Sequence, residues 1–509
     1  MFASQKRPWT GKLVLMGIFV LVMLFTLSAS AGGGGTEKPW YTGFTPILFL
    51  LGAVAILIWR LPKVKEEFPG QLAHLQDNSY RLRRVWNWLS LGTTYAFLYW
   101  GRYNLNVAVR ALGGEEVVAD FNWMFGAGTA VYGVSFLING PLTDRFGGRF
   151  SILVGACGAT IANILMGVVC WMSVNGEMEA RTLFWWILVL YSINMYFQSF
   201  GAVAIVKCNA AWFHLRERGV FGAIFGILIA LGIYFAYDWS RYIIKDLKLP
   251  VYWAFFAPAI ALTIAFVINL FVARDRPSEA GFKNIKTGTA LDDETGPSDH
   301  PIAVFKIMWQ SPVIMTIACI EFCSGFLRQA IMQIYPMFMK SIGGTESFIY
   351  VNWGMLLCTA GILGGVFAGT ISDRVFQSRR GPVAAVLYVG MLIGGIGMCF
   401  LFDSPHLGPI VIMMSLCVIG VHGMLSGTAS MEFAGAKNTG IAVGLIDGFV
   451  YAGTALQAIL YKYTLPEGGE SAKDPANWWF WPIAMVPIAI IGLWLSYKIR
   501  NEKPQPKTA

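Results

Sequence analysis

Residues 94–104 decide how the rest of the chain is interpreted, and they read Thr94-Tyr95-Ala96-Phe97-Leu98-Tyr99-Trp100-Gly101-Arg102-Tyr103-Asn104. They lie within an apolar, aromatic run that is long enough to cross a bilayer, which takes roughly 20 residues. Arg102 falls near the middle of this run, where a guanidinium costs between about 3 and about 15 kcal/mol. The sequence therefore predicts a partner for Arg102, either a carboxylate on a neighbouring helix or an anionic ligand. Tyr95 and Tyr99 lie seven and three residues earlier on the same helical face. A face that carries two hydroxyls and a guanidinium fits a water-filled cavity better than a single buried ion pair, so it favours a ligand.

The composition of the chain indicates a membrane protein. Of its 509 residues 56% are hydrophobic and 13% are charged, about half the charged fraction of a typical soluble protein. Apolar runs of spanning length recur along almost the whole sequence, which predicts an all-α polytopic protein surrounded by lipid. The net charge of +9 does not indicate a nucleic-acid partner, because the basic residues fall in short loops between apolar runs, as the positive-inside rule expects.

Motifs for enzymatic chemistry are missing from the sequence. The eight cysteines lie in or beside apolar runs without a CxxC pair, so we interpret them as small packing residues. The sequence has no GxxxxGK[ST], GxGxxG or HExxH pattern. We therefore expect no enzyme activity, no cofactor and no metal site.

Residues 1–84 form an N-terminal extension with two hydrophobic segments, at about 13–27 and 45–59. Basic residues precede the first segment, and the small residues Ala29-Ser30-Ala31 follow it. This pattern fits either a membrane-spanning helix or a signal peptide that is cleaved after the small residues. Both interpretations stay open, so the fold has one or two additional N-terminal helices.

Twelve membrane spans are predicted after residue 85. A Gly/Thr/Asp/Pro-rich stretch at 273–307 is typical of a flexible cytoplasmic linker and divides the spans six and six. The predicted domains are thus a six-helix bundle over 85–272 and a second bundle with a short tail over 308–509. The spans are 88–110, 122–142, 150–172, 182–206, 219–237, 252–272, 313–338, 349–371, 381–402, 407–429, 440–461 and 477–497.

A short charged loop follows the second predicted span of each half. The first loop carries Asp144, Arg145 and Arg149, and the second carries Asp373 and Arg374. An acidic side chain at such a place can cap or pair with neighbouring helix ends, and the adjacent glycines permit close helix approach. We expect both loops to act as gate latches on the cytoplasmic face.

Arg328 is a second arginine in the middle of a predicted span. From Arg102 to Asp144 is 42 residues, and from Arg328 to Asp373 is 45, so the two arginines occupy near-equivalent places in two repeats. An axis along the membrane normal between repeats brings equivalent residues face to face at mid-depth, where repeat-built transporters bind substrate. Two guanidinium forks at that depth suit a dianion such as phosphate.

These features together resemble the major facilitator superfamily. More narrowly, the chain is similar over about 88–500 to the organophosphate:phosphate antiporters, which exchange sugar phosphates or glycerol-3-phosphate for inorganic phosphate. The motifs that carry this resemblance are Tyr95-x3-Tyr99-x2-Arg102, Arg216-Glu217-Arg218-Gly219, Arg274-Asp275-Arg276-Pro277, Asp373-Arg374-Val375-Phe376-x2-Arg379-Arg380-Gly381 and Glu432-x4-Lys437-x2-Gly440. The resemblance implies that Arg102 and Arg328 bind the phosphoryl group and that Tyr95, Tyr99 and Tyr132 face it.

Two positions depart from that family. Phe136 stands where many members have a lysine, and residues 227–230 read Ile-Leu-Ile-Ala where glycerol-phosphate members carry a histidine. These departures indicate a different or bulkier organic moiety than glycerol. Lys207, near the cytoplasmic end of the fourth span, either supplies a substitute cation to the substrate or extends to the membrane interface.

Three further polar residues within spans have two interpretations each. Glu321, two turns before Arg328, and Asp447 are either coupling groups that carry a proton or resting counter-ions. Gln329 either contacts the hydroxyls of the substrate or forms an interhelical hydrogen bond.

The sequence as a whole predicts a secondary transporter that exchanges an organic phosphate ester for inorganic phosphate by alternating access. One alternative is a proton- or sodium-coupled symporter of an organic anion. The other is a non-transporting sensor of sugar phosphate, in which a protein partner docks through residues 1–84. We expect a monomer in a bacterial inner membrane, with a small phosphate-bearing anion as its ligand.

Overall fold

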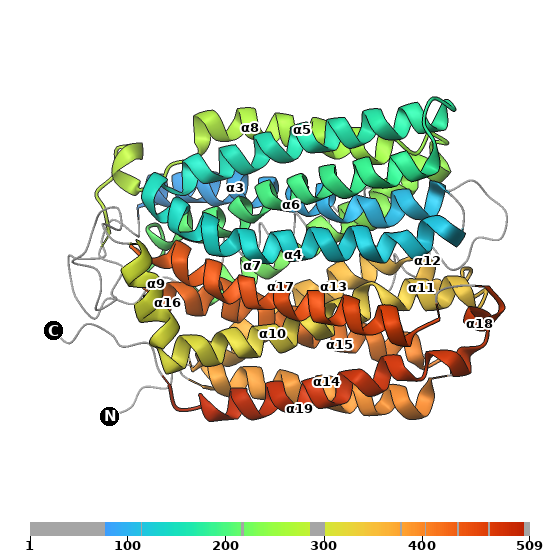
Figure 1. The fold of residues 1–509 in the computed structure, drawn as a ribbon. Coiled ribbons are helices and arrows are strands. Elements are labelled where there is room, and N and C mark those ends of the chain that lie inside the picture. Colours follow the sequence, from blue (N-terminus) through green and yellow to red (C-terminus); the bar gives the residue numbers. More distant parts are fainter. Residues whose placement is uncertain are drawn as a thin grey trace. The chain divides into compact units, whose positions relative to one another are not determined.

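The computed structural model describes residues 77–112, 115–214, 218–285, 301–376, 379–402, 404–434, 437–466 and 469–502. The predicted N-terminal helices and their cleavage site, residues 286–300 of the predicted linker and the side chains of Asp373 and Arg374 lie outside the described residues. The described parts of the predicted linker contain the short helix η6 (Pro277–Ala280) and the start of α9 (Pro301–Gln310). Every regular element in the described ranges is a helix, which confirms the all-α prediction (Figure 1).

The first helix set comprises α3 to α8 and precedes the predicted linker. α7 continues into two π-helical turns, η4 (Phe235–Trp239) and η5 (Tyr242–Asp246). The members of the set are α3 (Asn78–Leu112), α4 (Glu115–Phe146), α5 (Gly148–Val174), α6 (Ala180–Ala210), α7 (Arg218–Tyr234) and α8 (Trp253–Val272).

The second helix set comprises α9 to α19. α15 continues through the π-helical turn η7 (Leu425–Ala429) into α16. The members of the set are α9 (Pro301–Gln310), α10 (Pro312–Met332), α11 (Ile334–Ser341), α12 (Phe348–Val351), α13 (Trp353–Arg374), α14 (Arg380–Leu401), α15 (Leu407–Met424), α16 (Ser430–Ala434), α17 (Thr439–Thr464), α18 (Gly469–Lys473) and α19 (Phe480–Lys498).

The helices are built to cross a membrane. In the described part of the chain nine helical segments are long and apolar enough to do so, and α13 adds a shorter apolar helix. The full count of twelve spans stays a prediction. Polarity is inverted relative to a soluble protein, because Phe271 and Phe400 are 73% and 83% exposed whereas Arg102 and Arg328 are each 1% exposed. The outer surface therefore suits lipid, and the interior holds the polar groups.

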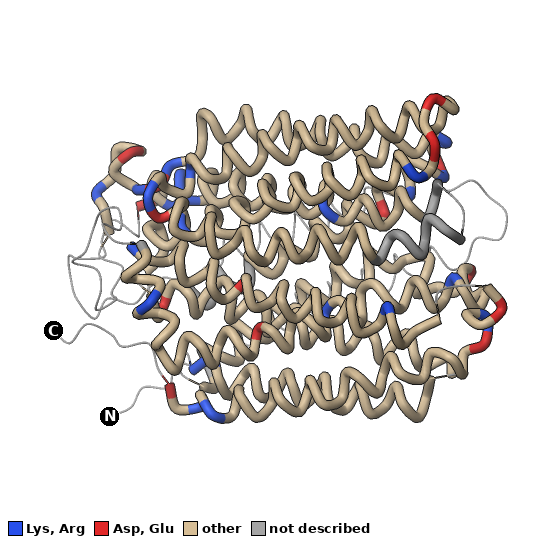
Figure 2. The backbone as a smooth tube through the Cα atoms, viewed as in Figure 1, with Lys and Arg blue, Asp and Glu red and all other residues tan. Residues whose placement is uncertain are grey.

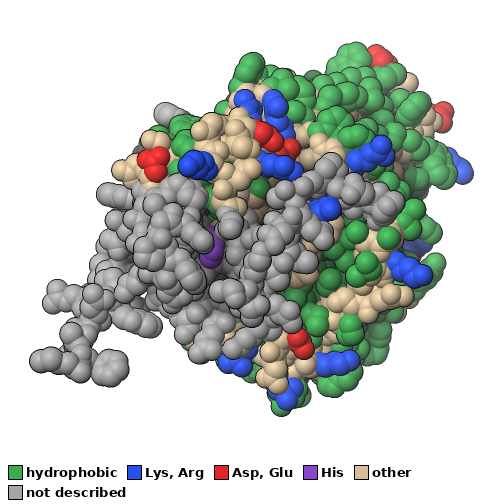
Figure 3. Space-filling view, turned by 90° about the vertical axis from the view of Figure 1, so that its left-hand side faces the viewer, with side chains coloured by type: hydrophobic (Ala, Val, Ile, Leu, Met, Phe, Trp, Pro, Cys, Tyr) green, Lys and Arg blue, Asp and Glu red, His purple; other side chains and the backbone are tan. Residues whose placement is uncertain are grey.

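Charged residues concentrate toward the ends of the helices, with few between (Figure 2). Lys and Arg side chains are spread over the face at the end where α9 and α16 lie (Figure 3). The positive-inside rule assigns this end to the cytoplasm.

A clasp of hydrogen bonds closes the first helix set at the cytoplasmic end. Asn87 in α3 donates to the Arg274 carbonyl at 3.2 Å and accepts the Arg274 N–H at 2.8 Å. The Trp212 indole also donates to the Arg274 carbonyl, at 3.1 Å. Asp275 accepts the Arg149 N–H at 2.8 Å and so caps the start of α5. The Arg274–Pro277 motif is thus a structural clasp that fixes the ends of α3, α5 and α8.

α4 and α17 pack against each other and join the two sets. Near one end the Lys462 ammonium lies 3.8 Å from the centroid of the Trp123 ring. Toward the other end Gly140 packs on Gly440 so closely that a Cβ at 140 would lie 2.7 Å from the Gly440 carbonyl oxygen. Glycines at such crossings let helix backbones approach each other.

α7 and α13 join the sets in the same way. Gly226 packs near Gly365 at the cytoplasmic end, and Arg241, in the segment that continues α7, donates to the Val351 carbonyl at 2.7 Å at the outer end. Both joining pairs thus make contacts at both ends, and they enclose the central polar residues.

Candidate substrate-binding site

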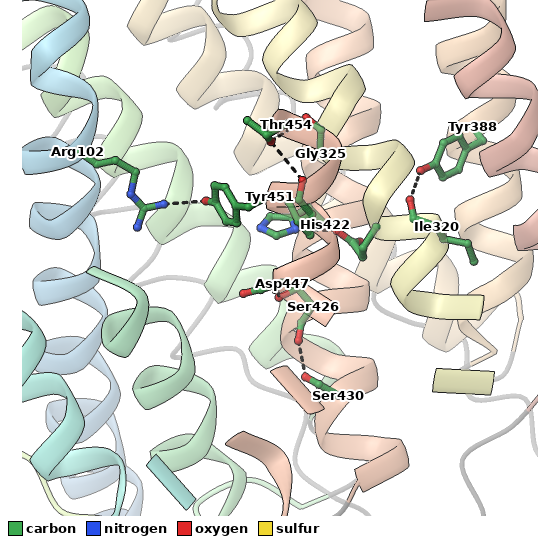
Figure 4. Close-up of polar contacts among 12 residues, drawn as sticks. Arg102, Ile320, Gly325, Tyr388, His422, Ser426, Ser430, Asp447, Tyr451 and Thr454 are labelled. Carbon is green, nitrogen blue, oxygen red and sulfur yellow. Dashed lines mark hydrogen bonds and ion pairs between the residues drawn. The ribbon is translucent and has the colours of Figure 1, made fainter. Parts of the chain in front are cut away.

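Arg102 on α3 is held by hydrogen bonds at the centre of the helices. Its Nη1 donates to the Tyr451 hydroxyl at 2.8 Å (Figure 4), and its Nη2 donates to the Tyr132 hydroxyl at 2.5 Å. Its Nε and Nη2 also donate to Gln198 Oε1, at 3.3 and 3.2 Å. The Tyr99 ring lies 4.4 Å from the guanidinium carbon, a cation–π contact. Arg102 is therefore pre-positioned, and its acceptors are uncharged.

A network of buried amides fixes the backbone of α3 at this point. Asn163 and Asn194 donate to the Gly101 carbonyl at 3.2 and 2.9 Å, and Tyr191 donates to the Arg102 carbonyl at 3.2 Å. Asn194 also accepts from Gln198 at 3.3 Å, which connects the backbone anchor to the residue that holds the guanidinium. α5 and α6 thus hold Arg102 both at its backbone and at its side chain.

Arg328 on α10 contrasts with Arg102. Its side chain is buried, yet its Nε, Nη1 and Nη2 have no hydrogen-bond partner among the described residues. Its guanidinium carbon lies 5.7 Å from the centroid of the Tyr451 ring. A buried donor without an acceptor costs about 1–3 kcal/mol, and more when it is charged. Arg328 is thus a strong donor group that is poised for an acceptor from outside the protein.

Tyr451 on α17 lies between the two arginines. Its hydroxyl accepts from Arg102, its ring faces Arg328, and the Tyr132 ring packs edge-on against it at 4.2 Å. The sequence interpretation did not include Tyr451. A signal was present, because Tyr451 is four residues after Asp447 and therefore on the same face of its helix.

The other predicted binding residues surround this centre. The Tyr99 hydroxyl is buried without a hydrogen-bond partner among the described residues. Gln329 donates to the Tyr103 hydroxyl at 3.4 Å, a contact that joins the two helix sets. Tyr95 stacks on Phe225 at 5.4 Å and makes an edge contact with Tyr99. Tyr99 and Gln329 thus lie at the arginine pair, and Tyr95 packs in the aromatic layer beside it.

Glu321 and Asp447 are buried near Arg328 without a hydrogen bond to it. Glu321 Oε2 lies 2.8 Å from His422 Nδ1, and Asp447 accepts from Ser426 at 2.5 Å (Figure 4). The partner of Glu321 is therefore the histidine, which the sequence interpretation missed. Arg328 is not locked to a permanent acidic neighbour.

Asp144 forms a latch between the two sets at the cytoplasmic end. Its carboxylate accepts the Gly440 and Ile441 N–H groups at 2.9 and 2.8 Å, at the start of α17. An anion at a helix N-terminus is favoured by the helix dipole and by the free N–H groups there. Lys207 completes the latch, with its ammonium 2.5 Å from Asp144 and 2.5 Å from the Lys437 carbonyl.

This placement differs from the substrate contact that was one expectation for Lys207. Along α6 it lies nine residues from Gln198, the neighbour of Arg102, which is about 14 Å of helix rise. Its ammonium lies on Asp144 and not at the arginine pair. Its partner is an acid whose position depends on packing between the sets.

The remaining gate residues act within one set. Arg149 donates to the Leu270 carbonyl at 2.7 Å, and the Arg145 guanidinium lies over the Phe146 ring. Neither contact crosses to the second set, so among the described side chains of the two loops Asp144 alone is part of the latch between sets. In the second set Arg380 and Glu432 form a buried ion pair at 2.6 Å.

A second acidic contact between the sets lies at the outer end. Asp238 in η4 faces the first turn of α13, where Met355 donates a backbone hydrogen bond and Gly354 leaves room for the carboxylate. Arg241 is its nearby cation. Asp238 thus mirrors Asp144, because each places a carboxylate from the first set on the N-terminus of a helix in the second set.

Comparison with known proteins identifies the family of the chain. The family model described as Major Facilitator Superfamily matches residues 91–458. A "Glycerol-3-phosphate transporter" of Bacillus subtilis (strain 168) is 26% identical over 401 residues, covering 74% of the chain and 85% of the relative. The "Membrane sensor protein UhpC" of Escherichia coli (strain K12) is 24% identical and covers 75% and 85%. A "Probable hexose phosphate transport protein" of Chlamydia trachomatis is 23% identical and covers 87% and 96%. The chain is a multi-pass integral membrane protein and belongs to the major facilitator superfamily.

Proposed function

We propose that this protein is a secondary transporter that exchanges an organic phosphate ester for inorganic phosphate by alternating access. One observation carries the proposal: Arg328 is fully buried without a protein acceptor, near an Arg102 that is already held in place. A phosphoryl group supplies the acceptors that Arg328 lacks. The relatives named as glycerol-3-phosphate and hexose phosphate transporters support an ester of this class.

The chemistry of the site favours a dianion. Each guanidinium offers a planar fork of donors that matches two phosphoryl oxygens. Arg102 keeps its neutral acceptors Tyr132, Tyr451 and Gln198, which leave its charge uncompensated by hydrogen-bonded carboxylates. The tyrosine hydroxyls and Gln329 remain to contact the organic part of the ester.

Transport follows from the division of the site between the two sets. Arg102 belongs to the first set and Arg328 to the second, so a phosphoryl group that binds both favours the closed arrangement. The latches at Asp144 and Asp238 then release in turn, each opening one end. Closing the empty carrier buries Arg328 without an acceptor, which costs at least about 1–3 kcal/mol. The return of the empty carrier is thereby slowed, and this favours exchange over net transport.

Exchange assays in proteoliposomes test the proposal. Vesicles loaded with phosphate should take up labelled phosphate through the protein, and unlabelled ester outside should compete. R102K and R328K should each lose most of this exchange, because a lysine is a point charge without the fork. Arg181→Lys is the matched control, since Arg181 lies exposed at the outer start of α6. Wild-type exchange by R102K or R328K would contradict the proposal.

A sensor is the second candidate, because one relative is named a membrane sensor protein. The same protein would then bind a phosphate ester without moving it. Binding of ester in the absence of any exchange, together with a protein that co-purifies through residues 1–84, would select this candidate. We place the protein in a bacterial inner membrane as a monomer in either case.

A further inference from the structure

The buried formal charges around the site balance one another. Arg102 and Arg328 carry two positive charges, and Glu321 and Asp447 carry two negative charges when ionised. All four side chains are at most 2% exposed. Arg328 interacts electrostatically with both carboxylates. A dianion that binds the arginines therefore leaves two excess negative charges in a region of low dielectric.

The two carboxylates belong to a cluster that can hold protons. Glu321 Oε2 on α10 and His422 Nδ1 on α15 are 2.8 Å apart, and either group can carry the proton of this hydrogen bond. Asp447 on α17 accepts from Ser426 and lies within electrostatic range of His422. None of the three is hydrogen-bonded to an arginine among the described residues. The charged and titratable groups that face the cluster from the packed helices are Arg328 and Cys323 on α10, Tyr451 on α17, Tyr388 on α14, Arg102 on α3 and Tyr132 on α4.

The cluster lies close to the phosphoryl-binding groups along the helices. Glu321 precedes Arg328 by two turns on the same face of α10, about 10 Å of helix rise. Asp447 precedes Tyr451 by one turn of α17, and Tyr451 contacts both arginines. A change in charge at the arginines therefore changes the electrostatic potential at the cluster.

We propose, on the basis of the transport function proposed above, that Glu321, His422 and Asp447 form a proton-binding site that is loaded together with the substrate. When a dianionic ester binds Arg102 and Arg328, at least one proton moves from solvent to a carboxylate oxygen or to the imidazole. No covalent bond to the substrate forms or breaks. When the ester leaves, the carboxylates again balance the arginines and the proton returns to solvent. Because the titrating groups interact, the proton count belongs to the cluster and not to one residue.

Isothermal titration calorimetry of the purified full-length protein measures this proton uptake. Glycerol-3-phosphate and glucose 6-phosphate are titrated at pH 7.5, where an ester with a second pKa of about 6 is almost entirely a dianion. Titrations in buffers of different ionisation enthalpy give the proton number as the slope of observed enthalpy against ionisation enthalpy. We expect between one and two protons taken up per ester bound.

The outcomes separate the proton site from the transport function. Binding heat with a slope of zero contradicts the proton site and leaves phosphate exchange intact. If the protein shows no binding heat and no exchange with either ester or with inorganic phosphate, the transport function is contradicted. The proton site, which rests on that function, is then contradicted as well.

Variants assign the protons to the cluster. E321Q, H422Q and D447N should each lower the slope by up to one proton, because each removes one titratable group. Glu470→Gln is the matched control, since the Glu470 side chain is 88% exposed on α18, and its slope should equal that of the wild type. If one cluster variant fails to fold, the slopes of the other two variants and of the wild type still test whether the cluster binds the protons. A full slope in the folded cluster variants would overturn the assignment.

Discussion

Replacing Lys207 with methionine tests whether the contact with Asp144 is a latch between the helix sets. The Asp144 side chain is completely buried, and the Lys207 side chain is 14% exposed. Removing one partner of a buried ion pair costs about 3–5 kcal/mol, and the partial exposure of Lys207 places this pair near the lower value. About 3 kcal/mol corresponds to a roughly 100-fold shift toward opening of the cytoplasmic end. Asp144 keeps its contacts to α17 in this variant, so the perturbation acts on the stability of the latch.

Hydrogen–deuterium exchange at the start of α17 measures this opening. The Gly440 and Ile441 amides belong to the first turn, where a helix offers no acceptor of its own, so Asp144 supplies their protection. In K207M their exchange should rise by up to about 100-fold. Lys473→Met is the control, because it breaks an exposed ion pair on α18 and should change nothing at α17.

Two results would refute this reasoning. One is unchanged exchange at the start of α17 in K207M. The other is a rise of equal size in the control. Weakened phosphate binding in K207M without a change in amide exchange would instead restore the substrate contact that the sequence suggested for Lys207.

Three further predictions concern the centre, the second helix set and the outer end. Tyr451→Phe leaves Arg102 Nη1 without its acceptor and should lower stability by about 1–3 kcal/mol, measured as a fall in Tm that added phosphate partly reverses. Arg380→Met isolates the buried Glu432 and should cost about 3–5 kcal/mol in unfolding experiments, whereas combining it with Glu432→Leu should recover most of the loss; no recovery would show that the pair is not the cause. Asp238→Asn should speed amide exchange at the start of α13 and leave that at α17 unchanged; a change at both ends would mean that the two latches are not independent.

The arginine pair could be predicted from the sequence because a charge in an apolar span is costly and stands out. Arg102 and Arg328 are each surrounded by apolar residues over a spanning length, and their similar distance to a loop aspartate suggested equivalent places. The structure buries both and places the Tyr451 ring between them. Asp144 could also be predicted as a latch residue, because its charged loop has a counterpart in the second half of the chain.

The partners of these residues could not be predicted, because they depend on the register between helices that are far apart in sequence. Lys207 reaches Asp144, and Glu321 reaches His422, only once α6 packs on α4 and α15 packs on α10. His422 is also a polar residue in an apolar span, but no motif or repeat connects it to Glu321. Asp238 lies in the π-helical turn that continues α7, and no sequence motif predicted this turn.

A structure of the protein with a phosphate ester bound tests the central claim most directly. The account predicts phosphoryl oxygens at about 2.7–2.9 Å from guanidinium nitrogens of both Arg102 and Arg328, the length of a charge-assisted hydrogen bond. Ester bound elsewhere, or an Arg328 that pairs with Glu321 while the ester contacts Arg102 alone, would contradict it.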